Sequence, residues 1–142
     1  MYNIEQTQYV KAPADKIFDA LTTKEGLFEI WTEKLIVKPE IGFINEFDFD
    51  DNYATRFKVL AMDRPHRIRW ECVESDQEWV GTSLSFDIEQ REKFAAVTLK
   101  HSNWRELTEF YRACNYNWGW FLYSLKLYCE KGEGIPYQRR QF

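Results

Sequence analysis

The chain has 142 residues, of which 44% are hydrophobic and 18% aromatic, and its formal net charge is −4. This length fits one domain with a substantial core, and the acidic balance argues against a nucleic-acid module, which needs a basic surface to neutralise phosphates. No apolar stretch approaches the roughly 18 residues of a membrane span, and the first residues do not resemble a signal peptide. We therefore expect a single domain over residues 1–142, located in the cytoplasm.

The first 31 residues predict one strand and two helices. Residues 2–11 alternate as a strand does. A helix should then begin near Pro13, because the missing N–H of proline is unpaired at a helix start anyway. A second, short helix is expected over residues 24–31, with Leu27, Phe28 and Trp31 on one side. Gly26 counts against this helix, because glycine is about 1 kcal/mol less favourable than alanine in a helix interior.

From residue 35 to about residue 102 the apolar residues recur with a period of two. Apolar positions such as Phe57, Trp70 and Phe86 alternate with polar ones, as in strands that bury one face. Short turn signals rich in Asp, Asn, Pro and Gly separate the runs. Because short connections join antiparallel neighbours, we expect a meander of about six strands, which ends with a strand over residues 94–101.

After Trp104 the period becomes helical again. A short helix or helical turn is expected near residues 107–111, and a long helix over residues 115–131 that ends at Gly132. The long helix carries apolar side chains on two sides, whereas a surface helix normally has one apolar stripe. Its inner stripe is formed by Trp118, Phe121, Leu122, Leu125, Tyr128 and Cys129, and its outer stripe by Trp120, Tyr123 and Leu127. The outer stripe should be covered either by residues 107–111 or by a second subunit in a homodimer.

Several segments resemble the START-like superfamily of polyketide cyclase and Bet v 1-type proteins. They are residues 10–22, 27–31, 62–70, 81–86 and 97–101, together with Gly119-Trp120 in the long helix. The branch that the terminal helix resembles is named for activators of the 90-kilodalton heat-shock chaperone ATPase. The resemblance implies an α+β helix-grip fold, in which a curved antiparallel sheet of about seven strands (β-α-α-β6-α) wraps around the C-terminal helix and leaves a cavity. It does not imply a particular reaction.

A cavity between that helix and the sheet would bind an apolar or aromatic small molecule. The residues expected to line it are Trp31, Phe57, Trp70, Thr82, Leu84, Phe86, Trp118, Phe121, Leu122 and Leu125. Alternatively, the same rings simply pack as a core. Thr55, Thr82, Thr98 and Tyr111 could orient a ligand by hydrogen bonds if they point inward, although a one-residue error in register would reverse their direction.

His101 is the candidate for acid–base catalysis, since an imidazole at a pocket mouth titrates near neutral pH; a histidine without a placed partner is more often structural. Cys72, Cys114 and Cys129 form no C-x-x-C pair, so with two histidines no zinc site is expected. No glycine-rich phosphate loop is present, and we expect no cofactor.

Three functions follow from these features. The first is a small-molecule binding protein, and the second is a cyclase- or hydratase-like enzyme that uses His101 or a pocket tyrosine. The third is an interaction module similar to the chaperone ATPase activators. A measured cavity, and the place of His101 relative to it, should discriminate between the first two.

Overall fold

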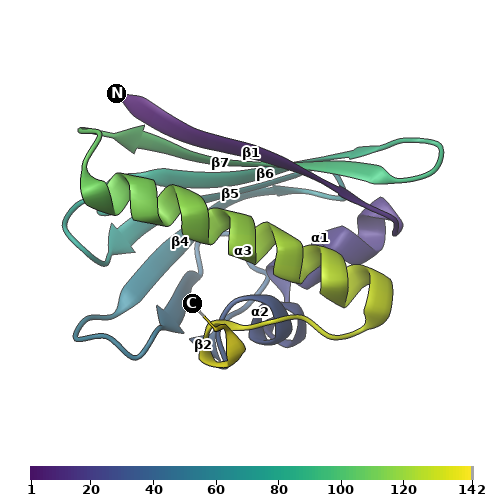
Figure 1. The fold of residues 1–142 in the computed structure, drawn as a ribbon, viewed down its shortest axis with the longest axis horizontal. Helices are drawn as coiled ribbons and strands as arrows, with labels where there is room; N and C mark the ends of the chain where they lie inside the picture. Colours follow the sequence, from purple (N-terminus) through teal and green to yellow (C-terminus); the bar gives the residue numbers. More distant parts are fainter. Residues whose placement is uncertain (142) are drawn as a thin grey trace.

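The computed structural model describes residues 1–141 of the chain (Figure 1). In chain order the elements are β1 Tyr2–Val10, α1 Ala14–Thr22, α2 Lys24–Ile30, β2 Lys34–Ile36, β3 Ile44–Asp48, β4 Thr55–Asp63, β5 Arg67–Glu74, β6 Ser83–Gln90, β7 Ala95–Trp104, α3 Glu109–Lys131 and a 3-10 turn, η1, Tyr137–Arg139. The strands form one seven-stranded sheet in the order β1-β7-β6-β5-β4-β3-β2. Every neighbouring pair is antiparallel. The predicted α+β helix-grip class is confirmed.

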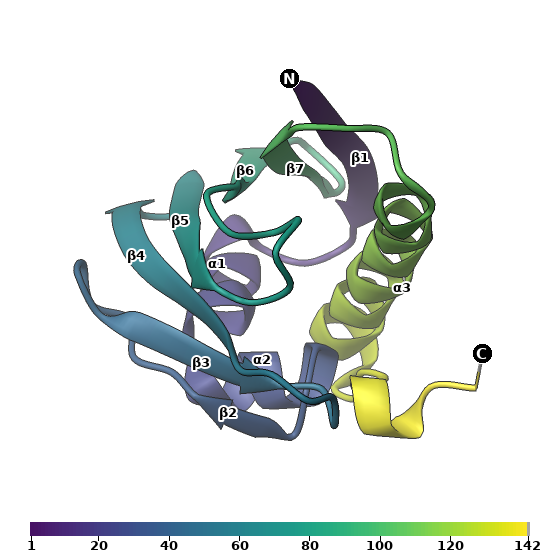
Figure 2. The same cartoon turned by 90° about the vertical axis from the view of Figure 1, so that its left-hand side faces the viewer.

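The sheet is strongly curved, and α3 lies across its open side (Figure 2). β1 follows one side of α3, while α2 lies near the C-terminal half of the helix (Figure 1). At 1.5 Å per residue, the 23 residues of α3 span about 35 Å. A helix of this length covers most of the concave face of the sheet. None of the helices within residues 1–141 is both long and apolar enough to cross a membrane.

Helix α3 begins six residues earlier than the sequence pattern predicts. The expected helical turn near residues 107–111 is not separate, because α3 continues through it from Glu109. Thr108 caps the start: its hydroxyl accepts a hydrogen bond from the backbone N–H of Tyr111 at 3.1 Å, as favoured N-cap residues do. The same hydroxyl donates to the Glu78 carboxylate at 2.5 Å. At the other end Gly132 has φ +88°, which is the left-handed C-cap that the sequence predicts.

Side chains join α3 to the edge strand β1. The amide of Gln6 donates to the backbone oxygen of Asn115 at 2.6 Å, and the Lys126 ammonium donates to the backbone oxygen of Tyr9 at 3.1 Å. The backbone N–H of Lys11 donates to the Glu130 carboxylate at 2.8 Å. An exposed sheet edge is a template for unwanted pairing, and here the long helix covers it.

The inner stripe of α3 faces the core as expected. Trp118, Phe121, Leu122, Leu125 and Cys129 are buried, whereas Tyr128 is only partly buried. On the outer stripe, Trp120 and Leu127 are partly buried, and Tyr123 is 47% exposed. The helix therefore has one fully buried face and a second face that is only partly covered within this chain.

Gly26 has a structural reason to be in α2. A Cβ atom at this position would lie 2.2 Å from the backbone oxygen of Ala20 in α1, which is closer than any real contact. The absence of a side chain at Gly26 therefore lets α1 and α2 pack closely, and the reduced helix propensity of glycine is the cost of that contact.

Candidate functional site: a pocket lined by aromatic rings

A pocket of about 230 Å³ opens between α3, the loops that follow β3 and β5, and the residues after α3. We call it the ring pocket. Seven of its lining residues carry aromatic rings: Trp31, Phe49, Tyr53, Trp79, Phe110, Trp118 and Tyr137. The two indoles of Trp79 and Trp118 stack in parallel, with centroids 5.8 Å apart and planes inclined by 14°. This arrangement presents flat apolar surfaces to a ligand.

The polar groups of the ring pocket are few. They are Asp51, Thr55, Ser75, Cys114, Asn117 and Arg140. The Thr55 and Ser75 hydroxyls are hydrogen-bonded to each other at 2.9 Å, and the Trp79 indole N–H donates to the Cys114 sulfur at 3.4 Å. Loss of hydration raises the pKa of Asp51 above its ordinary value. It also raises the pKa of Tyr53 to about 12, so this phenol keeps its proton at neutral pH.

Two of the ten predicted ligand-binding residues, Trp31 and Trp118, line the ring pocket. The other eight are buried side chains outside its lining: Phe57, Trp70, Thr82, Leu84, Phe86, Phe121, Leu122 and Leu125. Only Leu122 among these has as much as 2% of its surface exposed. The structure thus places the eight in a close-packed core beside the pocket.

Aromatic rings fill the space between α3 and the middle of the sheet. Phe121 stacks on Phe86 of β6 with centroids 5.7 Å apart, and Phe86 meets Trp70 of β5 edge-on at 5.9 Å. Trp31 contacts Phe121 at 5.3 Å and Trp118 at 5.5 Å. Because these side chains interdigitate, the open volume lies at the side of the core, under the loops and beside α3.

His101 lies behind the wall of the ring pocket and is fully buried. Its Nδ1 accepts from the indole N–H of Trp118 at 3.1 Å, and its Nε2 is 2.8 Å from the Thr82 hydroxyl. That hydroxyl also lies 2.5 Å from the backbone oxygen of Trp79. All three hydrogen bonds form when the Thr82 hydroxyl donates to the Trp79 oxygen and Nε2–H of His101 donates to the hydroxyl. The imidazole is then neutral, with its proton on Nε2.

Burial lowers the pKa of His101 to about 3. Both ring nitrogens have partners, and the residue is not part of the ring pocket lining. The geometry gives His101 a positioning role: it holds Trp118 and, through Thr82, the loop that carries Trp79. Catalysis by His101 stays a prediction, and it would require Trp118 to release Nδ1.

The four polar residues considered for ligand orientation have different positions. Thr55 lines the pocket, and Thr82 is bonded to His101. The expectation for Thr98 is wrong: its hydroxyl is 2.9 Å from that of Thr7 on the other face of the sheet, as the β1–β7 register requires. The Tyr111 hydroxyl donates to the backbone oxygen of Asn3 at 2.8 Å, at the edge of the sheet.

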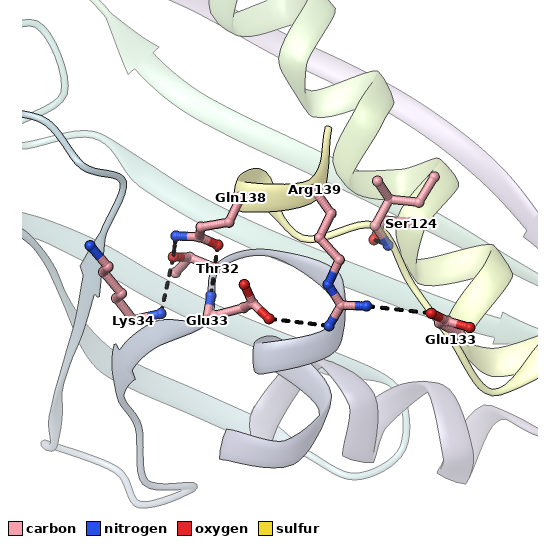
Figure 3. Close-up of polar contacts among 8 residues, drawn as sticks. Thr32, Glu33, Lys34, Ser124, Glu133, Gln138 and Arg139 are labelled. Atoms are coloured by element: carbon pink, nitrogen blue, oxygen red, sulfur yellow. Dashed lines mark hydrogen bonds and ion pairs between the residues drawn. The ribbon is translucent and has the colours of Figure 1, made fainter. Parts of the chain in front are cut away.

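Residues 134–140 form a strap that folds back from α3 over α2 and β2 (Figure 3). The backbone N–H of Ile135 donates to the Ser124 hydroxyl at 2.7 Å, and that of Tyr137 donates to the backbone oxygen of Trp31 at 2.7 Å. The Gln138 amide donates to the Thr32 hydroxyl at 2.8 Å and accepts from the backbone N–H of Glu33 at 3.0 Å.

The strap also packs closely. A Cβ atom on Gly134 would lie 2.4 Å from the backbone oxygen of Glu29. Arg139 adds ion pairs with Glu33 at 3.2 Å and Glu133 at 3.4 Å (Figure 3). The strap contributes Tyr137 and Arg140 to the ring pocket.

Sequence patterns missed the pocket residues that lie outside regular strands. Asp51, Tyr53, Ser75 and Trp79 are in loops, and Tyr137 and Arg140 are in the strap. Period-two and helical patterns carry no information about such positions. The one available signal was composition, because Trp79 and Tyr137 are large rings in segments that otherwise read as polar turns.

The three cysteines are free and buried. Burial raises the pKa of Cys72 and Cys114 to about 12 and that of Cys129 to about 11. Within residues 1–141, no cluster of three or more His, Cys, Asp or Glu side chains is placed to hold a metal ion. The lining of the ring pocket offers apolar and aromatic contacts and a few polar groups.

The curved sheet, the long terminal helix and the pocket beside it define the START-like, helix-grip class of proteins, whose fold is of a ligand-binding type. Within that class, residues 11–130 match the family described as Activator of Hsp90 ATPase homolog 1-like protein. The chain belongs to this family, as the resemblance in the sequence implied.

Solved structures agree with this assignment. The chain is 35% identical to the Aha1 of Colwellia psychrerythraea, whose solution structure is a dimer; 94% of this chain and 100% of that chain are covered, with a TM-score of 0.86. Protein SSP2350 of Staphylococcus saprophyticus is 17% identical, covers 94% of this chain and 96% of its own, and has a TM-score of 0.76.

DynU16, a protein of the dynemicin biosynthetic locus, is 18% identical with a TM-score of 0.77; 93% of this chain and 48% of that chain are covered. At 17% and 18% identity, the likeness to SSP2350 and to DynU16 shows a shared fold alone. Comparison with curated protein sequences finds no significant match.

Proposed function

We propose that the protein binds a small aromatic or apolar molecule in the ring pocket. The observation that carries this proposal is the lining itself, in which seven aromatic rings surround an open volume of about 230 Å³. An engineered apolar cavity of about 150 Å³ holds benzene, and pockets for drug-sized ligands begin at about 300 Å³. The volume therefore favours a ligand of one or two rings over a long-chain lipid.

The test uses 2-naphthamide, a neutral two-ring probe, and follows the indole N–H signals of the protein by NMR during a titration. We expect saturable shifts at Trp79 and Trp118, whose rings stack in the lining. Tyr137→Ala removes a ring from the pocket and should weaken binding at least about 5-fold, since aromatic contacts contribute roughly 0.5–1.5 kcal/mol each beyond their buried area.

Tyr123→Ala is the matched control, because Tyr123 is 47% exposed on α3 and does not line the pocket. It should leave the affinity unchanged. Absence of saturable binding, together with native mass spectra of cell-purified protein that contain no bound small molecule, would contradict the proposal.

A second candidate is an interaction module that stimulates a chaperone ATPase. What favours it is membership of the Activator of Hsp90 ATPase homolog 1-like family and the 35% identity to the Aha1 of Colwellia psychrerythraea. The measurement is ATP turnover of a 90-kilodalton heat-shock chaperone at increasing concentrations of this protein. A rising, saturable rate supports the role, whereas a flat titration excludes it.

We also infer a homodimer and a cytoplasmic location. The dimer is supported by the dimeric state of the Colwellia relative and by the partly uncovered outer stripe of α3, and light scattering across a dilution series tests it. The location is supported by three free cysteines, since disulfides are rare where thiols are kept reduced. Fractionation of cells tests the location.

A further inference from the structure

The guanidinium of Arg140 is a cation in the lining of the ring pocket. Its Nε donates to the backbone oxygen of Ile135 at 2.9 Å, and its Nη2 donates to the backbone oxygen of Ile30 at 3.0 Å. These two bonds fix the plane of the group between the strap and the end of α2. Two neutral carbonyl groups position the charge without neutralising it.

No carboxylate within residues 1–141 lies at ion-pair distance from Arg140. The contrast is its neighbour Arg139, which pairs with both Glu33 and Glu133. Partial burial lowers the pKa of Arg140 to about 10, so the group still carries its charge at neutral pH. A partly desolvated cation without a counter-ion is costly, and an anion placed beside it recovers that cost.

The carboxylate in the pocket lining is that of Asp51, and it does not serve as this counter-ion. The groups that act on the pKa of Asp51 are Asp48 and Tyr53. The charged or polar side chain that acts on the pKa of Arg140 is the Tyr137 phenol. Neither Asp51 nor Arg140 therefore contributes to the pKa shift of the other.

We propose that Arg140 is the specificity-determining residue of the ring pocket and that it selects small aromatic ligands bearing a carboxylate over their neutral counterparts. The inference rests on the proposed binding function and names the class of its ligand. A guanidinium presents a planar pair of N–H donors that matches a carboxylate, and such charge-assisted bonds are stronger than neutral ones. The rings of Trp79 and Trp118 would hold the aromatic part, and the strap would hold the acid-binding group.

The test compares two probes of the same shape, 2-naphthoate and 2-naphthamide, on the full chain at pH 7 by calorimetry or NMR. We expect the wild-type protein to bind the carboxylate at least about 10-fold more tightly than the amide, with an advantage that shrinks as salt is raised. Arg140→Gln should bring the ratio of the carboxylate and amide affinities close to 1, and Arg140→Lys should keep part of the advantage. Arg67→Gln is the control, because Arg67 is an exposed arginine of β5 that pairs with Asp87. This substitution should change neither affinity.

The outcomes separate this inference from the proposed function. Equal affinities for the two probes, insensitive to salt in the wild type and to Arg140→Gln, would overturn the role of Arg140 and leave aromatic binding in place. Binding of neither probe would overturn both. The salt dependence is measured on the wild-type protein, so the inference can fail even if Arg140→Gln does not fold.

Discussion

The indole N–H of Trp118 donates to Nδ1 of His101 across 3.1 Å, and this bond joins the pocket wall to a histidine in the core. It also fixes the protonation state of that histidine. An imidazole that accepts at Nδ1 and donates at Nε2 cannot take a second proton without losing the Trp118 bond. The stability of the fold therefore depends on pH through a residue that never reaches solvent.

Stability should fall as pH decreases below about 6.5. Above that value His101 is neutral in both the folded and the unfolded chain and contributes no pH dependence. Below it the unfolded chain binds a proton, whereas burial keeps the folded histidine neutral down to a pKa of about 3. This group alone should therefore lower the free energy of unfolding by about 1.4 kcal/mol per pH unit within that window.

Urea denaturation at pH 7, 6, 5 and 4 measures this slope. His101→Gln, which cannot titrate, should lose that part of the slope, and His66→Gln, which removes an exposed imidazole in a turn, should retain it. Equal slopes in the wild type and in His101→Gln would show that the buried imidazole is not the source.

Two glycine-to-alanine substitutions should act in opposite directions. Gly26→Ala places a Cβ atom 2.2 Å from the Ala20 backbone oxygen, and the separation of α1 from α2 should cost about 1–3 kcal/mol. Gly119→Ala lies within α3, and its Cβ would meet only the Gln6 side chain at 3.7 Å, which is an ordinary contact. It should stabilise the protein by about 0.5–1 kcal/mol through helix propensity. Urea midpoints measure both, and a stabilised Gly26→Ala would mean that the two helices separate at little cost.

Gly134→Ala should displace the strap. Its Cβ would lie 2.4 Å from the Glu29 backbone oxygen and 2.9 Å from the Ser124 hydroxyl. Because the strap carries Tyr137 and Arg140, both should leave the pocket, and binding of 2-naphthoate should weaken at least about 10-fold. Gly119→Ala serves as the control, because it is the same substitution at a position where the added Cβ would meet only an ordinary contact. Unchanged probe affinity in Gly134→Ala would mean that the strap does not complete the site.

The three thiols should react slowly in the folded protein. Their raised pKa values leave very little thiolate at pH 8, and the thiolate is the reactive form. A colorimetric disulfide reagent should label the native protein at least about 100-fold more slowly than the urea-unfolded chain. Fast labelling of one thiol in the native state would identify a site that opens locally.

The architecture could be predicted from the sequence because its elements are regular and amphipathic. The alternation around Phe57, Trp70 and Phe86 predicted the strands and their buried face. The start of α3 was missed, although Cys114 continues the buried stripe one helical turn before Trp118 and Thr108 is a favoured N-cap residue that bonds the nearby Tyr111 N–H.

The position of the pocket could not be predicted in the same way. Trp31 and Trp118 were identified because they lie on elements with a readable pattern. Whether a ring such as Phe121 fills a core or lines a cavity depends on how completely its neighbours occupy the space, and that is a property of three-dimensional packing. Arg140 was missed because its place in the pocket lining depends on the fold of the strap, and one of the two hydrogen bonds that position its guanidinium joins residues 110 positions apart.

The attachment of the strap also has a consequence for the order of events during synthesis. Residues 30–33 at the end of α2 receive their strap partners from residues 137–140, and β1 pairs with β7, roughly 90 residues later. Such long-range contacts slow folding, because a large loop must close before they are gained. On the ribosome, the middle strands can pair one after another as they emerge. The ring pocket, by contrast, cannot assemble until Arg140 has left the exit tunnel, so a partly made chain has a forming sheet but an incomplete ring pocket.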